Sequence, residues 1–254
     1  MVILMANEQY WSDKKILVVG ASSDLCSEML PNFVRMMGAV GLHYNSNMYP
    51  IESYADMKNV KAFQKNFSPE QHCEDVVHHF VEWAGGIDFL IVMTGNCVHP
   101  VNWRDLSETD LREDYYINLI APFLIAKAAA EYMKNKGGRI IFTGTASAQN
   151  AGGSNSLSYG AAKLALECIM KRMAKDLAQD NILVNMVCPG FILSKFHTAV
   201  MKRGKEELEK RAEFVPLKRS GTMKEIAAPY LFLLSENASF ITGEVLNVKG
   251  GDWI

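Results

Sequence analysis

The chain has 254 residues, 49% of them hydrophobic, which is enough for one large core, and a single α/β domain of this length is ordinary. Lys and Arg total 26 against 28 Asp and Glu, so no excess of positive charge is available to hold a nucleic-acid backbone. The apolar opening, MVILM, is too short for a signal peptide or for a membrane span of about 20 residues. We therefore expect neither a nucleic-acid nor a membrane partner.

Short β-rich runs alternate with longer helical stretches along the chain, and Ser107 supplies capping chemistry before the longest of them. The basic residues between 202 and 211 are interleaved with glutamates, as on a solvated helix face. In chain order, the predicted elements are the strand Lys15–Val19, the helix Leu25–Met37, the strands Ala39–Tyr44 and Val60–Phe67, the helix Pro69–Trp83, the strand Phe89–Met93, the helix Ser107–Asn135, the strand Arg139–Phe142, the helix Ser158–Gln179, the strand Ile182–Val187, the helix Lys224–Leu234 and the strand Glu244–Val248.

Several strand runs lack the alternation of apolar and polar residues, which indicates a parallel sheet buried on both faces by helices. Repeated strand–helix alternation predicts one doubly wound α/β domain over residues 1–254, with about seven strands and helices on both faces. In such a sheet, ligands bind at the carboxyl ends of the strands, where the strand order reverses.

The cysteines and histidines predict no metal site. The five cysteines form no CxxC pair, and an odd number without a framework indicates reduced thiols in a cytoplasmic protein. Among the six histidines, only His78 and His79 are adjacent, and neighbours in a helix point to different faces.

The turn after the first strand reads Gly20-Ala-Ser-Ser-Asp24-Leu-Cys26. A nucleotide site uses glycine here, because the backbone must turn tightly and approach the pyrophosphate at the helix N-terminus. Only the first glycine is present, so the turn alone does not separate a nucleotide site from an ordinary strand-to-helix connection.

Tyr159 and Lys163 lie four residues apart at the start of a predicted helix, so both side chains share one face. A nearby cation stabilises phenolate and would lower the pKa of the tyrosine from about 10, which makes a proton donor and acceptor usable near neutral pH. The pair alone also fits a surface tyrosine beside a solvated lysine.

Other segments surround this pair in a distinctive order. They are GRIIFTGTAS at 138–147, VNMVCPGFILS at 184–194, PLKRSG at 216–221 and FITGEVLNVKGG at 240–251. Together with the pair, they resemble the short-chain dehydrogenase/reductase family, in its subgroup of about 250 residues that includes 3-oxoacyl-carrier-protein reductases. The resemblance runs from about Lys15 to Gly251, and it implies a Rossmann-type fold and a nicotinamide cofactor.

The resemblance implies catalytic roles for four residues. Tyr159 matches the general acid or base, and Lys163 matches the residue that lowers its pKa and bonds the nicotinamide ribose. Asn118 matches a helix asparagine that supports a water in the proton relay. The family's substrate-binding serine falls on Thr145, which we prefer, while Ser147 would replace it only if the loop shifts.

The resemblance also assigns a cofactor site. Pro189, Gly190 and Ile192 match the loop that packs on the nicotinamide, and Ser194 matches a position that bonds its carboxamide or the phosphates. Asn66 and Phe67 match the pair that meets the adenine. The remaining positions expected to bind the cofactor are Gly20, Ser22, Ser23, Asp24, Leu25, Asn45, Thr94 and Gly95.

The sequence departs from the family pattern at three places. Asp24 and Cys26 stand where glycines are usual, and Val92-Met93-Thr94-Gly95 replaces Asn-Asn-Ala-Gly, with the loss of two amides. Asn45 stands where relatives that prefer NAD carry an aspartate for the ribose 2′-hydroxyl. Because a neutral residue does not repel a 2′-phosphate, we expect NADP(H) to be preferred over NAD(H), although no Arg or Lys replaces the aspartate.

The resulting hypothesis is an NAD(P)(H)-dependent oxidoreductase that interconverts a ketone and a secondary alcohol. The alternatives are a non-catalytic scaffold or nucleotide-responsive protein, favoured by the eroded glycine turn, and an enzyme that uses its cofactor for epimerisation or elimination. Residues 194–216, here named the lid segment, are expected to cover a small-molecule substrate. Two helices, Ser107–Asn135 and Ser158–Gln179, match those that build homodimers and homotetramers in the family, and the apolar Trp253 and Ile254 are expected to dock on a neighbour.

Overall fold

The computed structural model describes residues 8–150 and 152–252, so the opening MVILM and the terminal Trp253 and Ile254 lie outside the described residues. Seven parallel strands form one sheet in the order β3-β2-β1-β4-β5-β6-β7. The strands are β1 (Lys15–Val19), β2 (Ala39–Tyr44), β3 (Val60–Gln64), β4 (Phe89–Val92), β5 (Gly138–Thr143), β6 (Ile182–Pro189) and β7 (Val245–Val248). The doubly wound parallel sheet predicted from the apolar runs is therefore confirmed.

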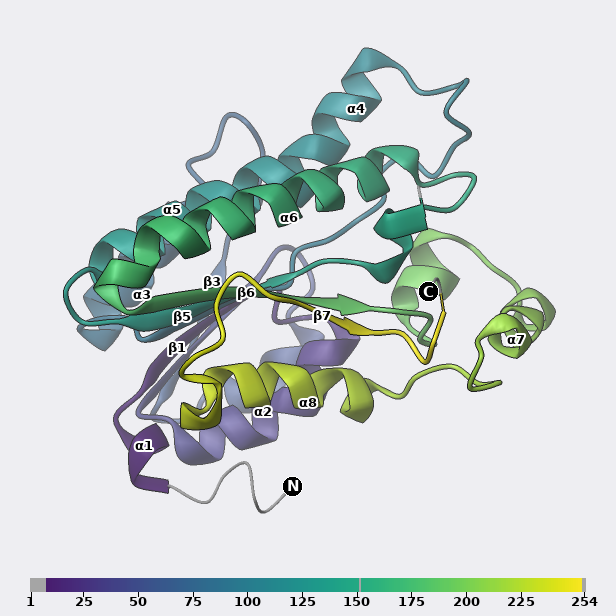
Figure 1. The fold of residues 1–254 in the computed structure, drawn as a ribbon. Coiled ribbons are helices and arrows are strands. Elements are labelled where there is room, and N and C mark those ends of the chain that lie inside the picture. Colours follow the sequence, from purple (N-terminus) through teal and green to yellow (C-terminus); the bar gives the residue numbers. More distant parts are fainter. Residues whose placement is uncertain (1–7, 151, 253–254) are drawn as a thin grey trace.

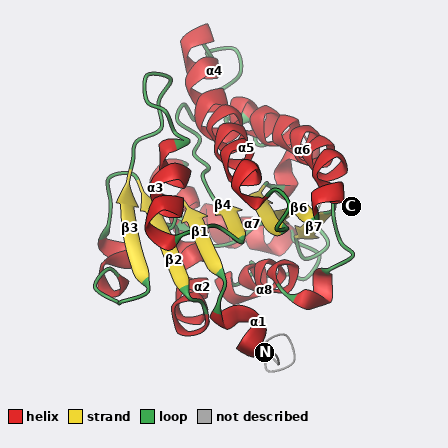
Figure 2. Cartoon of the chain, turned by 90° about the vertical axis from the view of Figure 1, so that its left-hand side faces the viewer, coloured by secondary structure: helices red, strands yellow, loops and turns green. Residues whose placement is uncertain are grey.

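Helices cover both faces of the sheet (Figures 1 and 2). One face carries α3 (Asp75–Ala84), α5 (Ala121–Met133) and α6 (Leu157–Leu177), with α4 (Glu108–Tyr115) beyond the sheet edge. The other face carries α1 (Glu8–Ser12), α2 (Asp24–Met36) and α8 (Met223–Leu234). Each layer buries its own apolar cluster against the sheet, one centred on Phe80, Ile125 and Phe142, the other on Trp11, Phe33 and Tyr230.

One further helix, α7 (Lys205–Phe214), and several short helical segments complete the described chain. The short segments are the 3₁₀ turns Tyr49–Tyr54, Ala146–Asn150, Ala178–Asp180 and Glu236–Ala238 and the π-helical turns Tyr116–Ile120 and Phe196–Val200. No helix in residues 8–150 and 152–252 is long and apolar enough to cross a membrane.

Two predicted boundaries were wrong, and one predicted helix is interrupted. The third strand ends at Gln64 instead of Phe67, because Phe67 turns inward and is buried against the core. The next helix begins at Asp75 instead of Pro69, since backbone bonds such as Gln71 N to Ser68 O form turns first. The long helix from Ser107 is not uniform: Ser107 caps it as expected, but a π-helical turn interrupts it at Tyr116–Ile120.

Candidate active site

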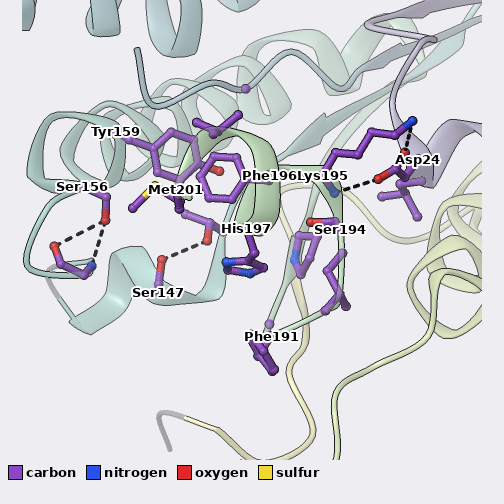
Figure 3. A pocket seen from close by; sticks show the side chains of 18 of the residues that line it. Asp24, Ser147, Ser156, Tyr159, Phe191, Ser194, Lys195, Phe196, His197 and Met201 are labelled. Carbon is purple, nitrogen blue, oxygen red and sulfur yellow. Dashed lines mark hydrogen bonds and ion pairs between the residues drawn. The ribbon is translucent and has the colours of Figure 1, made fainter. Parts of the chain in front are cut away.

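A cavity of about 690 Å³ lies at the carboxyl ends of the strands (Figure 3). Its lining comes from the turn before α2, the ends of β4, β5 and β6, the first turns of α6, and the lid segment. The predicted residues that line it are Ser22, Ser23, Asp24, Leu25, Thr94, Gly95, Thr145, Tyr159, Lys163, Pro189, Gly190, Ile192 and Ser194, and Ser147 lines it too. Residues more than 170 positions apart in the sequence therefore meet in one cavity.

Lys163 fixes the ends of two neighbouring strands. Its side chain is 2% exposed, and its Nζ donates to the Thr94 carbonyl at 2.7 Å and to the Thr143 carbonyl at 2.9 Å. Burial lowers the pKa of Lys163 to about 7, because a charged ammonium loses its hydration inside the protein. This lysine therefore exchanges a proton near neutral pH.

Tyr159 lies one helical turn before Lys163, with the Lys163 Nζ 6.0 Å from the centre of its ring. Burial raises the pKa of Tyr159, and a hydrogen bond with the Thr145 side chain opposes this only in part. We expected the Lys163 ammonium to lower the pKa of Tyr159, and without a bound cofactor this expectation is wrong. The Lys163 Nζ is hydrogen-bonded to two carbonyl groups, and burial disfavours its charged form. Tyr159 is thus protonated at neutral pH.

The hydroxyls of Thr145 and Ser147 are hydrogen-bonded to each other at 3.0 Å, and both residues line the cavity. With Tyr159, they form a series of three hydroxyl groups after β5. The two residues considered for the substrate-binding position are therefore neighbours in one network.

Asn118 lies outside the cavity lining, in the π-helical turn, and is fully buried. Its Oδ1 accepts from the Asn96 N–H at 3.1 Å, and its Nδ2 donates to the Asn96 carbonyl at 2.7 Å. Together with Lys163, which holds the Thr94 carbonyl, it braces the loop after β4.

Asp114, four residues before Asn118, was not among the residues predicted from the sequence. This fully buried carboxylate accepts from the Val98 N–H at 2.8 Å and from the Ser158 hydroxyl at 2.6 Å. It ties the loop after β4 to the residue that precedes Tyr159. Its spacing of four from Asn118 on one helix was the available signal.

In the turn before α2, the backbone conformation requires a glycine at position 20. Gly20 has φ +83°, and a Cβ there would lie 3.1 Å from the Thr94 nitrogen. The Ser23 side chain caps α2 by accepting from the Cys26 N–H at 3.1 Å, while Cys26 is fully buried in the core. A cysteine in place of the usual glycine is therefore accommodated.

Asp24 faces the lid segment across the cavity mouth (Figure 3). Its carboxylate accepts from the Lys195 N–H at 2.8 Å and pairs with the Lys195 ammonium at 3.0 Å. The acidic residue thus links the start of α2 to the start of the lid segment.

His43 on β2 supports Gly20 from behind. Its Nδ1 accepts from the Gly20 N–H at 3.1 Å, so its Nε2 donates to the Lys65 carbonyl at 2.8 Å. The ring stacks on Phe67 at 4.4 Å, and burial lowers its pKa to about 4. Phe67, Asn45 and Asn66 do not line the cavity, and neither does Gly20; both asparagines are exposed to solvent.

The loop after β6 comes very close to the end of β7. A Cβ on Gly190 would lie 2.5 Å from Cα of Lys249, so only glycine fits. Ile192 and Ser194 follow along the cavity, and the lid segment then folds over it: the Phe196 ring lies 5.3 Å from that of Tyr159. No group of three or more His, Cys, Asp or Glu residues that could hold a metal ion occurs in the described part of the chain.

Comparisons with known proteins agree with this geometry. Residues 32–252 match the family model described as enoyl-(acyl carrier protein) reductase. The chain is 35% identical to the 3-oxoacyl-[acyl-carrier-protein] reductase of Aquifex aeolicus over 79% of this chain and 80% of that one. It is 34% identical to the 7alpha-hydroxysteroid dehydrogenase of Escherichia coli over 73% of this chain and 71% of that one. A solved short-chain dehydrogenase/reductase from Serratia marcescens matches with a TM-score of 0.84 and 25% identity, over 94% of this chain and 98% of that chain.

Proposed function

Because the chain belongs to the short-chain dehydrogenase/reductase family and is an NAD(P)-dependent oxidoreductase, we propose that it interconverts a ketone and a secondary alcohol, with Tyr159 as general acid and base. One observation carries the proposal. Tyr159, Thr145 and Lys163 meet on one cavity, the first two joined by a hydrogen bond.

The cavity fits a nicotinamide dinucleotide in two respects. The capped N-terminus of α2 opens into it, and the N–H groups of a helix N-terminus bind phosphate. Thr94 Oγ1 is buried without a hydrogen-bond partner within residues 8–150 and 152–252, so a bound group would satisfy it. The residues we propose to hold the cofactor are Gly20, Ser22, Ser23, Asp24 and Leu25 near the phosphates, Asn45, Asn66 and Phe67 near the adenosine, and Thr94, Gly95, Tyr159, Lys163, Pro189, Gly190, Ile192 and Ser194 near the nicotinamide.

When bound, the cofactor supplies or accepts the hydride. In the direction of ketone reduction, Tyr159 holds the proton that the substrate oxygen receives, and its raised pKa keeps that proton in place at neutral pH. Thr145 donates a hydrogen bond to the same oxygen and stabilises the charge that develops there. Asn118 and Lys163 keep the loop after β4 and the end of β5 fixed beside Tyr159.

We propose NADP(H) as the preferred cofactor. Asn45 is exposed at the end of β2 and carries no charge that would repel a 2′-phosphate. Calorimetric titration with each cofactor tests the preference: we expect a lower Kd for NADPH than for NADH. A lower Kd for NADH would reverse the assignment, and no binding of either would contradict the proposed reaction.

We also propose a homodimer or homotetramer in the cytoplasm. All five cysteines are free thiols, as suits a reducing compartment. Apolar side chains at the surface of α6 and the adjoining helix include Leu157 at 40%, Leu164 at 48% and Ile120 at 41% exposure, which a second copy would cover. Light scattering after size exclusion tests assembly, and a mass near the single-chain 28.4 kDa would contradict it.

A further inference from the structure

The lid segment brings several cations to the cavity, and most of them have a dedicated anion. Lys195 pairs with Asp24 at 3.0 Å, and Lys210 pairs with Glu206 at 2.8 Å. Arg211 pairs with Asp252 near the C-terminus. These three cations are held by carboxylates of the protein itself.

Arg203 differs from them. Its Nε lies 3.3 Å from the carboxylate of Glu207, a side chain that is 59% exposed. Neither terminal nitrogen of Arg203 has a hydrogen-bond partner in residues 8–150 and 152–252, although its side chain is only 26% exposed. A Cβ on Gly153 would lie 3.6 Å from Arg203 Nη2, so the guanidinium faces the loop after β5. The fork of N–H groups that suits a carboxylate or a phosphate is therefore unused.

His197 lies next to this arginine. The Arg203 N–H donates to the His197 carbonyl at 3.0 Å, and the imidazole packs 5.1 Å from Phe191 and 5.6 Å from Phe196 (Figure 3). Its Nδ1 is buried and has no hydrogen-bond partner in the described residues. Burial, and then the charges of Arg203 and Arg211, lower its pKa to about 4, so the ring is neutral.

These side chains lie close to the proposed reacting group. Phe196 contacts both His197 and Tyr159, with ring centres 5.6 Å and 5.3 Å away, and all of them line the same cavity. In the tautomer that carries its proton on Nδ1, the neutral imidazole of His197 donates one N–H, and the guanidinium fork of Arg203 donates two, so both suit a group rich in negatively charged oxygen atoms.

We infer that Arg203 and His197 bind an anionic group of the substrate, so that the enzyme acts on ketones or alcohols that carry a carboxylate or a phosphate. The inference rests on the proposed function, since it names the substrate class of the same cavity. The lid segment then supplies specificity, while Thr145 and Tyr159 act on the oxygen that reacts.

Two matched substrate pairs test it with the full-length protein and NADPH. The first is 3-oxohexanoate and its methyl ester, and the second is dihydroxyacetone phosphate and dihydroxyacetone. We expect a lower KM for the anion in at least one pair, and that pair identifies carboxylate or phosphate as the group. Arg203→Gln should raise that KM about 10- to 100-fold, the loss expected for a hydrogen bond to a charged group, and leave the neutral partner within about threefold.

Arg112→Gln is the matched control, because Arg112 also forms an ion pair with a glutamate one helical turn away but lies outside the cavity. Arg203→Lys should recover part of the affinity. Calorimetric titration of both anions into the complex with NADP⁺ measures binding without turnover. Equal KM values for anion and neutral partner, or no saturable binding of either anion at millimolar concentration, would overturn the inference. Unchanged turnover in Tyr159→Phe would instead overturn the proposed reaction, whether or not the anionic substrates bind more tightly than the neutral ones.

Discussion

The floor of the cavity and the lid segment above it are built by different means. The floor is formed by Thr94, Thr145, Tyr159 and Lys163, and Lys163 is hydrogen-bonded at 2.7 and 2.9 Å to the carbonyls of Thr94 and Thr143 at the strand ends. The lid segment is held by ion pairs at its two ends, Lys195 with Asp24 and Arg211 with Asp252, and by a small apolar cluster in which Leu208 and Val215 pack on Phe191. Buried hydrogen bonds fix atoms in place, whereas partly exposed ion pairs contribute little free energy and are screened by salt. The floor is thus suited to one reaction, and the lid segment to the choice of substrate.

The largest expected effect concerns the floor. Tyr159→Phe should lower turnover about 10³-fold on every substrate, because it deletes the proton donor, and should leave the Kd for NADPH nearly unchanged. The decrease in cofactor absorbance measures turnover. Tyr49→Phe, at a side chain 82% exposed, is the control. If Tyr159→Phe kept most of the activity, the reaction would not depend on the floor.

Thr145 should have the next largest effect. Thr145→Val should lower kcat about 10²-fold by removing one donor to the developing oxyanion, and Thr145→Ser should hold or raise it. Ser147→Ala distinguishes the roles of the two hydroxyls, since we expect it to lower kcat only slightly. If Thr145→Val were as active as the parent and Ser147→Ala were inactive, Ser147 would be the residue that donates to the substrate oxygen.

Lys163 should give the floor a pH-dependent stability. Its pKa is about 7 in the folded protein against 10.5 unfolded, so the unfolded chain binds more protons between these values. The free energy of unfolding of the parent should therefore rise relative to Lys163→Met as the pH increases from about 7 towards 10, by up to about 1.4 kcal/mol per pH unit. Urea unfolding at several pH values measures it. A constant difference between the two proteins would mean that Lys163 is charged throughout.

The smallest change in stability should come from breaking the ion pair between Asp24 and Lys195 of the lid segment. The Lys195 side chain is 68% exposed, so Asp24→Asn should change the free energy of unfolding by less than about 1 kcal/mol. The backbone N–H of Asp24 stays available to the phosphates in this variant, while its carboxylate no longer repels them at the helix N-terminus, so the Kd for NADPH should fall a few-fold. Calorimetry in low and high salt checks this. A weaker NADPH affinity would show that the side chain of Asp24 also holds the cofactor.

The sequence predicted the floor better than the lid segment. Apolar runs such as Phe89–Val92 specify a buried parallel strand, and the spacing of Tyr159 and Lys163 puts both on one helix face, so both predictions depend on local pattern. The partners of Lys163 are carbonyl groups, which no sequence pattern reveals. For this reason the predicted lowering of the pKa of Tyr159 was wrong. Arg203 was missed because a basic residue among glutamates also fits a solvated helix, and His197 because it is one of several scattered histidines that form no pattern.

The assembly of the cavity has a consequence for folding. Its lining comes from residues 22–25, 93–95, 143–163 and 189–223, and β1 meets β4 through pairs such as Ile16 with Phe89. Contacts so distant in sequence close slowly, so the cavity is complete only when nearly the whole chain has folded. A ligand that fills it therefore stabilises the entire protein, by about 2.7 kcal/mol at 100 times its Kd. A higher ligand concentration then lowers the fraction of chains that are unfolded and open to proteolysis.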